Sequence, residues 1–98
     1  MSRTIALAAA LAAAAFSAHA QDNPCNLASA CAICHGTEGR SPSKDLVPLA
    51  GLPSAYIVRQ MVDFRDGKRP ATVMHQIAKG YTDPQIDAMA GWFAAQKR

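Results

Sequence analysis

The pentapeptide Cys31-Ala32-Ile33-Cys34-His35 constrains this chain more than any other feature, because it holds two of the three cysteines in 98 residues. A chain this short buries a modest core and often needs a disulfide, a metal or a cofactor for stability. Three cysteines cannot all pair within one chain, so disulfides alone leave at least one thiol over. The chemistry of the pentapeptide is therefore the first question that the sequence raises.

Four interpretations compete for Cys31 and Cys34. A zinc site wants four ligands, commonly from a second Cys-x-x-Cys or a His-x-x-x-His, and the sequence contains neither. A thioredoxin-like redox pair belongs beside a β-α-β pattern, and the chain shows no convincing strand. A disulfide between the two cysteines leaves His35 without a role. Covalent attachment of a c-type haem through Cys-x-x-Cys-His accounts for all three residues.

The spacing suits this attachment chemically. Residues i and i+3 of a helix share one face, so the thiols of Cys31 and Cys34 can both add to the vinyl groups along one porphyrin edge. His35 follows directly and can reach the iron as the proximal ligand. Gly36 lets the chain turn away at once. The sequence therefore predicts one covalent haem c, held by Cys31 and Cys34, with His35 on the iron.

Residues 1–20 are predicted to be a signal peptide, outside the fold. Arg3 supplies a positive charge, a largely apolar run of 12 residues extends from Ile5 to Phe16, and Ala18-His19-Ala20 matches a small-x-small cleavage pattern. The run is shorter than the roughly 20 residues that a membrane-spanning helix needs. Cleavage before Gln21 leaves one periplasmic domain, residues 21–98, with no membrane insertion.

The charge balance argues against nucleic acid as a partner. Ten Lys and Arg residues stand against seven Asp and Glu, and removing Arg3 with the signal peptide leaves a net charge of +2, nine minus seven. The remaining basic residues form no dense run of the kind that nucleic-acid binders carry.

Hydrophobic periodicity predicts an all-α fold of about four helices wrapped around the haem. Asp22-Asn23-Pro24 resembles a helix start, and a loop rich in Gly, Ser and Pro covers residues 36–53. Ser54 is expected to cap a helix that runs to about Arg65 and stops at Asp66-Gly67. A short helix is expected over 72–79, and Thr82 opens the last one. The expected core stripe of that helix is Ile86, Met89, Ala90 and Phe93.

Longer blocks of the sequence resemble a known family. The segments "CAICHGTEGRS", "PLAG", "YIVRQMVDFRDGKR", "ATVMHQIAKGYTD" and "IDAMAGWFAAQ" are together similar to small bacterial class I c-type cytochromes. The similarity is strongest to the monohaem cytochrome subunit of flavocytochrome c sulfide dehydrogenase. It covers essentially the whole of residues 21–98, and it implies one haem with His and Met axial ligands.

The resemblance implies Met74 as the distal iron ligand, because it matches the ligand methionine of the family. Met61 and Met89 lie on apolar helix stripes, where a core role is expected. His75 is the other candidate, and we expect it to face solvent. The resemblance also implies that Pro48 offers its carbonyl to the second ring nitrogen of His35.

Two filled axial positions leave the iron no site for a substrate, so the sequence favours one-electron transfer over enzyme chemistry. The resemblance suggests that the electrons come from the flavoprotein of a sulfide dehydrogenase. The first alternative is a free respiratory carrier, and the less favoured one is a peroxidase or gas-binding haem protein. Cys25 is expected to be a free thiol that can form a dimer on oxidation, and a link to a partner is the alternative. A ring of cations around the haem edge is one interpretation of four basic residues, and a merely solvated surface is the other: Lys44, Lys68, Arg69 and Lys79.

Overall fold

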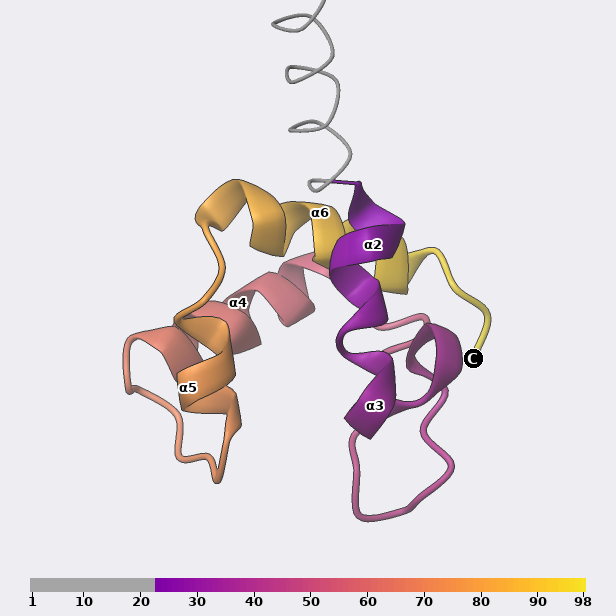
Figure 1. The fold of residues 1–98 in the computed structure, drawn as a ribbon, viewed down its shortest axis with the longest axis horizontal. Coiled ribbons are helices and arrows are strands. Elements are labelled where there is room, and N and C mark those ends of the chain that lie inside the picture. Colours follow the sequence, from indigo (N-terminus) through magenta and orange to yellow (C-terminus); the bar gives the residue numbers. More distant parts are fainter. Residues whose placement is uncertain (1–22) are drawn as a thin grey trace, which may run out of the picture.

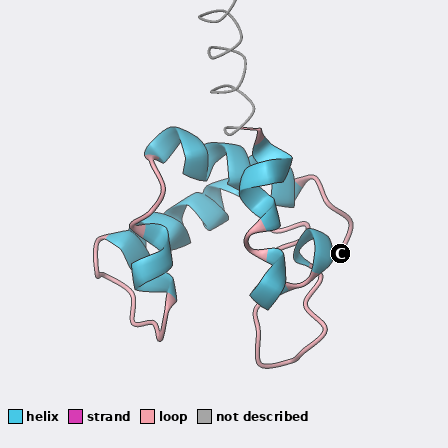
Figure 2. Cartoon of the chain, viewed as in Figure 1, coloured by secondary structure: helices cyan, strands magenta, loops and turns pink. Residues whose placement is uncertain are grey.

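The computed structural model describes residues 23–98, and every regular element in this range is a helix (Figures 1 and 2). The predicted signal peptide and Asp22 lie outside the described residues. The all-α prediction is therefore confirmed for the described part of the chain. No helix within it is long and apolar enough to cross a membrane. The elements are α2 (Pro24–Ser29), α3 (Ala32–His35), the 3-10 helix η1 (Thr37–Gly39), α4 (Ser54–Arg65), α5 (Met74–Ala78) and α6 (Asp83–Ala94).

The predicted first helix is in fact two helices. Asn23 caps α2, because its side chain accepts a hydrogen bond from the Cys25 N–H at 3.0 Å, and Pro24 fills the first turn. The Cys31 N–H then bonds to the carbonyl of Ala28, three residues back, which tightens the chain into a turn. A new helix, α3, starts after this turn. The expectation of about four helices was therefore one short for the α-helices of residues 23–98.

The middle helices agree with the sequence except at their ends. Helix α4 has the predicted bounds, but Pro53 is its N-cap and the Ser54 hydroxyl makes no capping bond, so the predicted cap was wrong. Gly67 follows its C-cap with a φ of 73°, as a helix stop requires. Helix α5 begins two residues later than expected, since Val73 has a φ of −131° and cannot continue a helix.

Helix α6 is the element that the sequence predicts best. The Thr82 side chain accepts from the Gln85 N–H at 3.3 Å, and the Gln85 side chain accepts from the Thr82 N–H at 3.0 Å, which completes a capping box. The predicted core stripe is buried throughout, with Ile86, Met89, Ala90 and Phe93 all at most 3% exposed.

The core is small and lies where α2 and α4 meet α6. Among residues 23–98, half of the eight buried apolar residues are alanines, and Ile86 is the one large side chain that is less than 2% exposed. Trp92 meets the Phe93 ring edge-on, with ring centroids 5.1 Å apart, and packs against the same cluster. Ala28 of α2 and Phe93 of α6 belong to one buried cluster, so the first and last helices of the described chain pack against each other. So small a core leaves several large apolar side chains uncovered, and they gather in the site described below.

Gly36 provides a direct test of the chain path after α3. It has φ 84° and ψ 165°, and a Cβ atom at this position would lie 2.0 Å from the Arg40 carbonyl oxygen. We expect Gly36→Ala to lower the free energy of unfolding by about 1–3 kcal/mol, as measured by urea denaturation. Gly91→Ala is the control, since its Cβ would meet nothing within 4 Å, and it should stabilise α6 by up to ~1 kcal/mol. Equal effects from the two variants would contradict the assigned turn.

Candidate functional site

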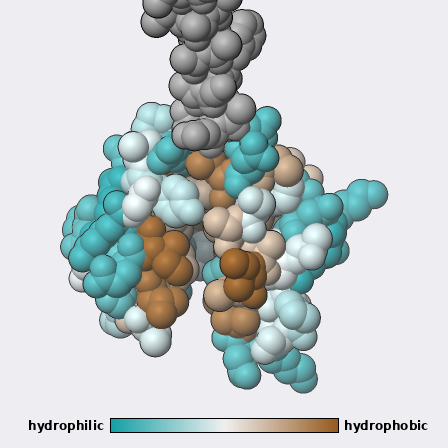
Figure 3. Space-filling view, viewed as in Figure 1, coloured by the Kyte–Doolittle hydropathy of each residue, from teal (hydrophilic) through white to brown (hydrophobic). Residues whose placement is uncertain are grey.

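The site is a notch between two arms of the fold. Helix α3 and the loop after it form one arm, α5 forms the other, and α4 and α6 join them (Figure 1). The space-filling view shows a hollow between these arms with apolar side chains on both sides (Figure 3). Large apolar side chains remain exposed in the segments that form the two walls: Ile33 (90%), Val47 (56%), Val73 (53%) and Ile77 (42%).

His35 is held in one orientation on the α3 wall. Its Nδ1 lies 2.6 Å from the carbonyl oxygen of Val47. A carbonyl oxygen only accepts, so Nδ1 must carry the proton and donate it. The neutral ring then has its lone pair on Nε2, which is the form that binds a metal.

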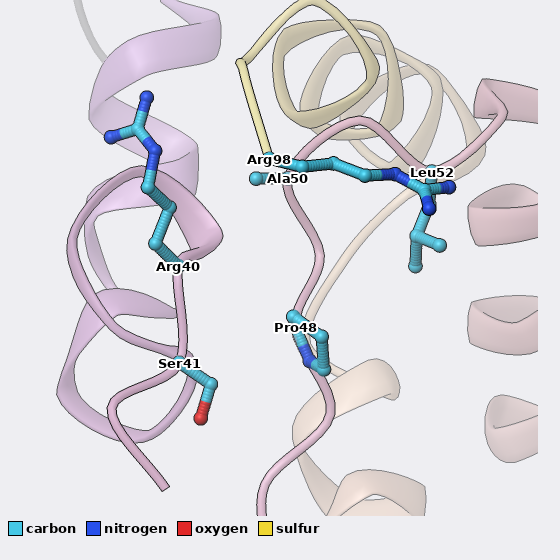
Figure 4. Close-up of a pocket in the computed structure, with 6 residues that line it drawn as sticks. All are labelled: Arg40, Ser41, Pro48, Ala50, Leu52 and Arg98. Atoms are coloured by element: carbon cyan, nitrogen blue, oxygen red, sulfur yellow. The ribbon is translucent and has the colours of Figure 1, made fainter. Parts of the chain in front are cut away.

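The acceptor is Val47, so the expected role of Pro48 was off by one residue. Pro48 still contributes, because a proline restricts the preceding residue to an extended conformation and so orients the carbonyl of Val47. Figure 4 shows Pro48 across a cavity of about 260 Å³ from Arg40 and Ser41. The side chains around this cavity include no iron ligand, and we assign it no part in the site.

Backbone hydrogen bonds fix the segment that carries Val47. The carbonyl of Gly39 accepts from the N–H groups of Leu49 at 2.8 Å and Ala50 at 3.2 Å, and the Gly51 N–H donates to the Phe93 carbonyl at 2.9 Å. A Cβ atom on Gly39 would lie 2.8 Å from the Ala50 nitrogen, so only glycine allows this close approach. The turn after the motif, the loop and the end of α6 are thus joined in one unit that presents the Val47 carbonyl to His35.

Cys31 and Cys34 differ in their surroundings. Cys31 is half-buried and packs against the core cluster, whereas Cys34 is exposed. Burial and then the neighbouring Cys34 raise the pKa of the Cys31 thiol above its ordinary value. No disulfide joins any two of the three cysteines, and Cys25 lies on the exposed surface of α2. Both motif thiols are therefore available for a covalent bond.

Met74 is the methionine at the facing wall. It is the first residue of α5 and is half-buried. Met89 is 3% exposed within the core, and Met61 packs against the core cluster, as the stripes predicted. His75 was expected to face solvent, and that was wrong: it is half-buried, and its Nδ1 is buried with no hydrogen-bond partner among the described residues. Helix α5, which carries His75, packs against α4.

Tyr81 lies close enough to Cys31 for the two groups to interact electrostatically, which sequence reasoning missed. It lies in the turn between α5 and α6 and is half-buried. Burial, and after it the proximity of Cys31, raise the pKa of the Tyr81 phenol. No periodic pattern marks Tyr81 in the sequence, so only the tertiary structure could identify it.

Comparison with known proteins gives this site a family. No protein-family model matches the chain. A cytochrome c4 of Pseudomonas aeruginosa is 37% identical over 70 residues, which cover 71% of this chain and 35% of that protein. The cytochrome subunit of sulfide dehydrogenase of Chlorobaculum tepidum is 43% identical over 68 residues, 68% of this chain and 60% of that protein. The chain belongs to the class I c-type cytochromes.

A third relative, a thiosulfate dehydrogenase electron acceptor of Thiomonas intermedia, is 39% identical over 70 residues, 68% of this chain and 32% of that protein. The cytochrome thus spans between about a third and three-fifths of the length of these three relatives. Its cofactor is haem c, in keeping with its family and with the free thiols of Cys31 and Cys34.

The walls of the notch fit a haem in two respects. The cytochrome has a small, alanine-rich core and exposes apolar side chains on both sides of the hollow. A large apolar group bound in the hollow would shield these side chains from water, which is energetically favourable. The donor set fits as well: α3 carries an imidazole with a free Nε2, α5 carries a thioether, and both are ligands that haem iron accepts.

Proposed function

We propose that the cytochrome binds one haem through thioether bonds from Cys31 and Cys34, with His35 and Met74 as the axial ligands, and transfers one electron at a time. The observation that carries this proposal is the 2.6 Å contact between His35 Nδ1 and the Val47 carbonyl, because it leaves Nε2 free for the iron. Such a contact also fixes the orientation of the ring.

The ligand set favours electron transfer over catalysis. With His35 and Met74 both bound, the iron has no open position for a substrate. The haem supplies a one-electron ferric–ferrous couple when bound, and a thioether ligand raises its potential relative to a second histidine. The apolar walls act in the same direction, because a low dielectric disfavours the extra charge of the ferric state.

The proposed electron donor is the flavoprotein of a sulfide dehydrogenase. The identity with the Chlorobaculum tepidum subunit supports this partner, and the thiosulfate dehydrogenase electron acceptor points to related sulfur chemistry. Export by the predicted signal peptide, with cleavage after Ala20, would deliver residues 21–98 to the periplasm as one domain. The names of both relatives imply a redox partner, and reduction kinetics with the flavoprotein distinguish the candidates.

The contact surface that we propose for this partner is the mouth of the notch. Ile33, between the two cysteines, is 90% exposed, and so large an exposed side chain beside the cofactor is suited to a dry protein contact. Exposed basic residues, among them Lys68 and Lys79, supply positive charge that can orient an acidic partner. Arg69 is less free to do so, since its guanidinium lies 4.9 Å from the centre of the Phe64 ring.

Stopped-flow reduction tests the partner. Sulfide added to the cytochrome mixed with its flavoprotein should reduce the flavin first and the haem after it. Ile33→Ser should weaken the complex by about ten-fold or more if Ile33 is a central apolar contact, while Cys25→Ser on α2 should leave it unchanged. Haem that stays oxidised beside a reduced flavin would exclude this donor and favour a free carrier.

A further inference from the structure

The arm that carries Met74 is attached to the fold at two neighbouring points. Helix α4 ends at Arg65 and α6 begins at Asp83, and residues 66–82 between them form the excursion that includes α5 (Figure 1). Within this excursion α5 packs mainly against α4. The position of Met74 therefore depends on how firmly the two ends of the excursion are held.

Each end has its own local anchor. At the start, the N–H groups of Lys68 and Arg69 both donate to the Asp63 carbonyl, at 2.8 and 3.3 Å. At the end, the Thr82–Gln85 capping box sets the first turn of α6. These anchors tie each end to its own helix, and neither ties α4 to α6.

One ion pair joins the two ends directly. Arg65 Nη1 lies 2.6 Å from Asp83 Oδ1, while its Nε is 3.7 Å from Asp66. The Arg65 side chain is 26% exposed, so the arginine is largely shielded from solvent. Asp83 is the more exposed partner at 72%. The pair closes the base of the excursion at the junction of α4 and α6.

The apolar packing of α4 against α6 is interrupted at this junction, and the ion pair lies beside the gap. An open groove with a volume of about 250 Å³ lies between residues of the two helices there. Its lining combines apolar side chains with the ion pair itself and one more carboxylate: Val58, Val62, Arg65, Asp83, Ile86 and Asp87. Close-packed helix contacts resist displacement, and an open groove removes part of that resistance.

We propose that Arg65 and Asp83 are positioning residues that hold the Met74 arm closed over the haem iron and so limit the access of small external ligands. The proposal rests on Met74 being the distal ligand, as proposed above. Breaking the pair frees the base of the excursion, so the arm opens more often and Met74 leaves the iron more often. An external ligand then competes with Met74 more successfully, although neither residue touches the haem.

The test is a titration of the ferric holoprotein with imidazole, followed by the loss of the near-infrared sulfur-to-iron band. Asp83→Asn and Arg65→Gln should each bind imidazole about two- to five-fold more tightly than the wild type, the range that partly exposed ion pairs support. High salt should bring the wild type towards the variants, because it screens the pair. Asp87→Asn, which removes a carboxylate from the same groove, is the matched control and should behave as the wild type.

A charge-swapped variant separates the pair from a general loss of stability. Arg65→Asp combined with Asp83→Arg should return the imidazole affinity towards that of the wild type. Variants that unfold at lower urea but bind imidazole as the wild type does would overturn the proposal and leave Met74 ligation intact. A wild type with no sulfur-to-iron band would instead refute Met74 ligation, and this proposal with it.

Discussion

Replacing Met74 by alanine is expected to remove the near-infrared sulfur-to-iron band of the oxidised cytochrome and to lower its reduction potential. The thioether stabilises ferrous iron, and its loss leaves water or another nitrogen or oxygen donor in its place. Axial ligands set haem potentials over a range of about 0.8 V, so we expect a fall on the order of tenths of a volt. An optical spectrum and a redox titration of the purified protein measure both effects.

Two other methionines are the controls for this experiment. Met89 is 3% exposed in the core, so Met89→Ala should cost about 2–5 kcal/mol of stability and leave the band in place. Met61 packs against the same core and should behave in the same way, with a smaller loss. A band that survives in Met74→Ala and disappears in either control would move the distal ligand to that residue.

The second large effect is expected from Cys31→Ala combined with Cys34→Ala. Without either thiol no thioether can form, so acid-acetone extraction should release all of the haem from the double variant. The folded domain should also become dependent on haem concentration, since a ligand that binds only the native state stabilises it by mass action. The alanine-rich core contributes little folding stability of its own when the cofactor is lost.

The single variants and Cys25 make this result specific. Cys34→Ala leaves the half-buried Cys31, and one remaining thioether should keep the haem on the chain. Cys25→Ser should change neither extraction nor stability, because Cys25 is an exposed free thiol on α2. Haem retained by the double variant would mean that another residue attaches it.

Local patterns determined which parts of the fold were predictable. The capping box at Thr82 and the buried stripe through Phe93 are short-range signals, and both appear in α6 as expected. The break between α2 and α3 was missed, because a tight turn at Ala30–Cys31 carries no Gly or Pro to mark it. Propensity alone favours a continuous helix there.

The site was predictable as residue types and not as contacts. The motif and Met74 were named from the sequence, and the structure puts them on facing walls of one notch (Figures 1 and 3). Three features depend on tertiary packing and were missed: the Val47 acceptor, the buried Nδ1 of His75 and the approach of Tyr81 to Cys31. Two of these features are contacts between residues that are distant in the sequence, and the third is the burial of a side chain. Hydrophobic periodicity predicts neither the contact partners nor the burial of a single polar atom.

The most direct test of a covalent haem site is the mass of the denatured wild-type protein. After unfolding in acid and separation from free pigment, we expect the polypeptide to carry the added mass of one haem, with thioether bonds located on the peptide that contains Cys31 and Cys34. A polypeptide with no added mass, and all of the haem in the solvent, would contradict the c-type assignment on which this account rests.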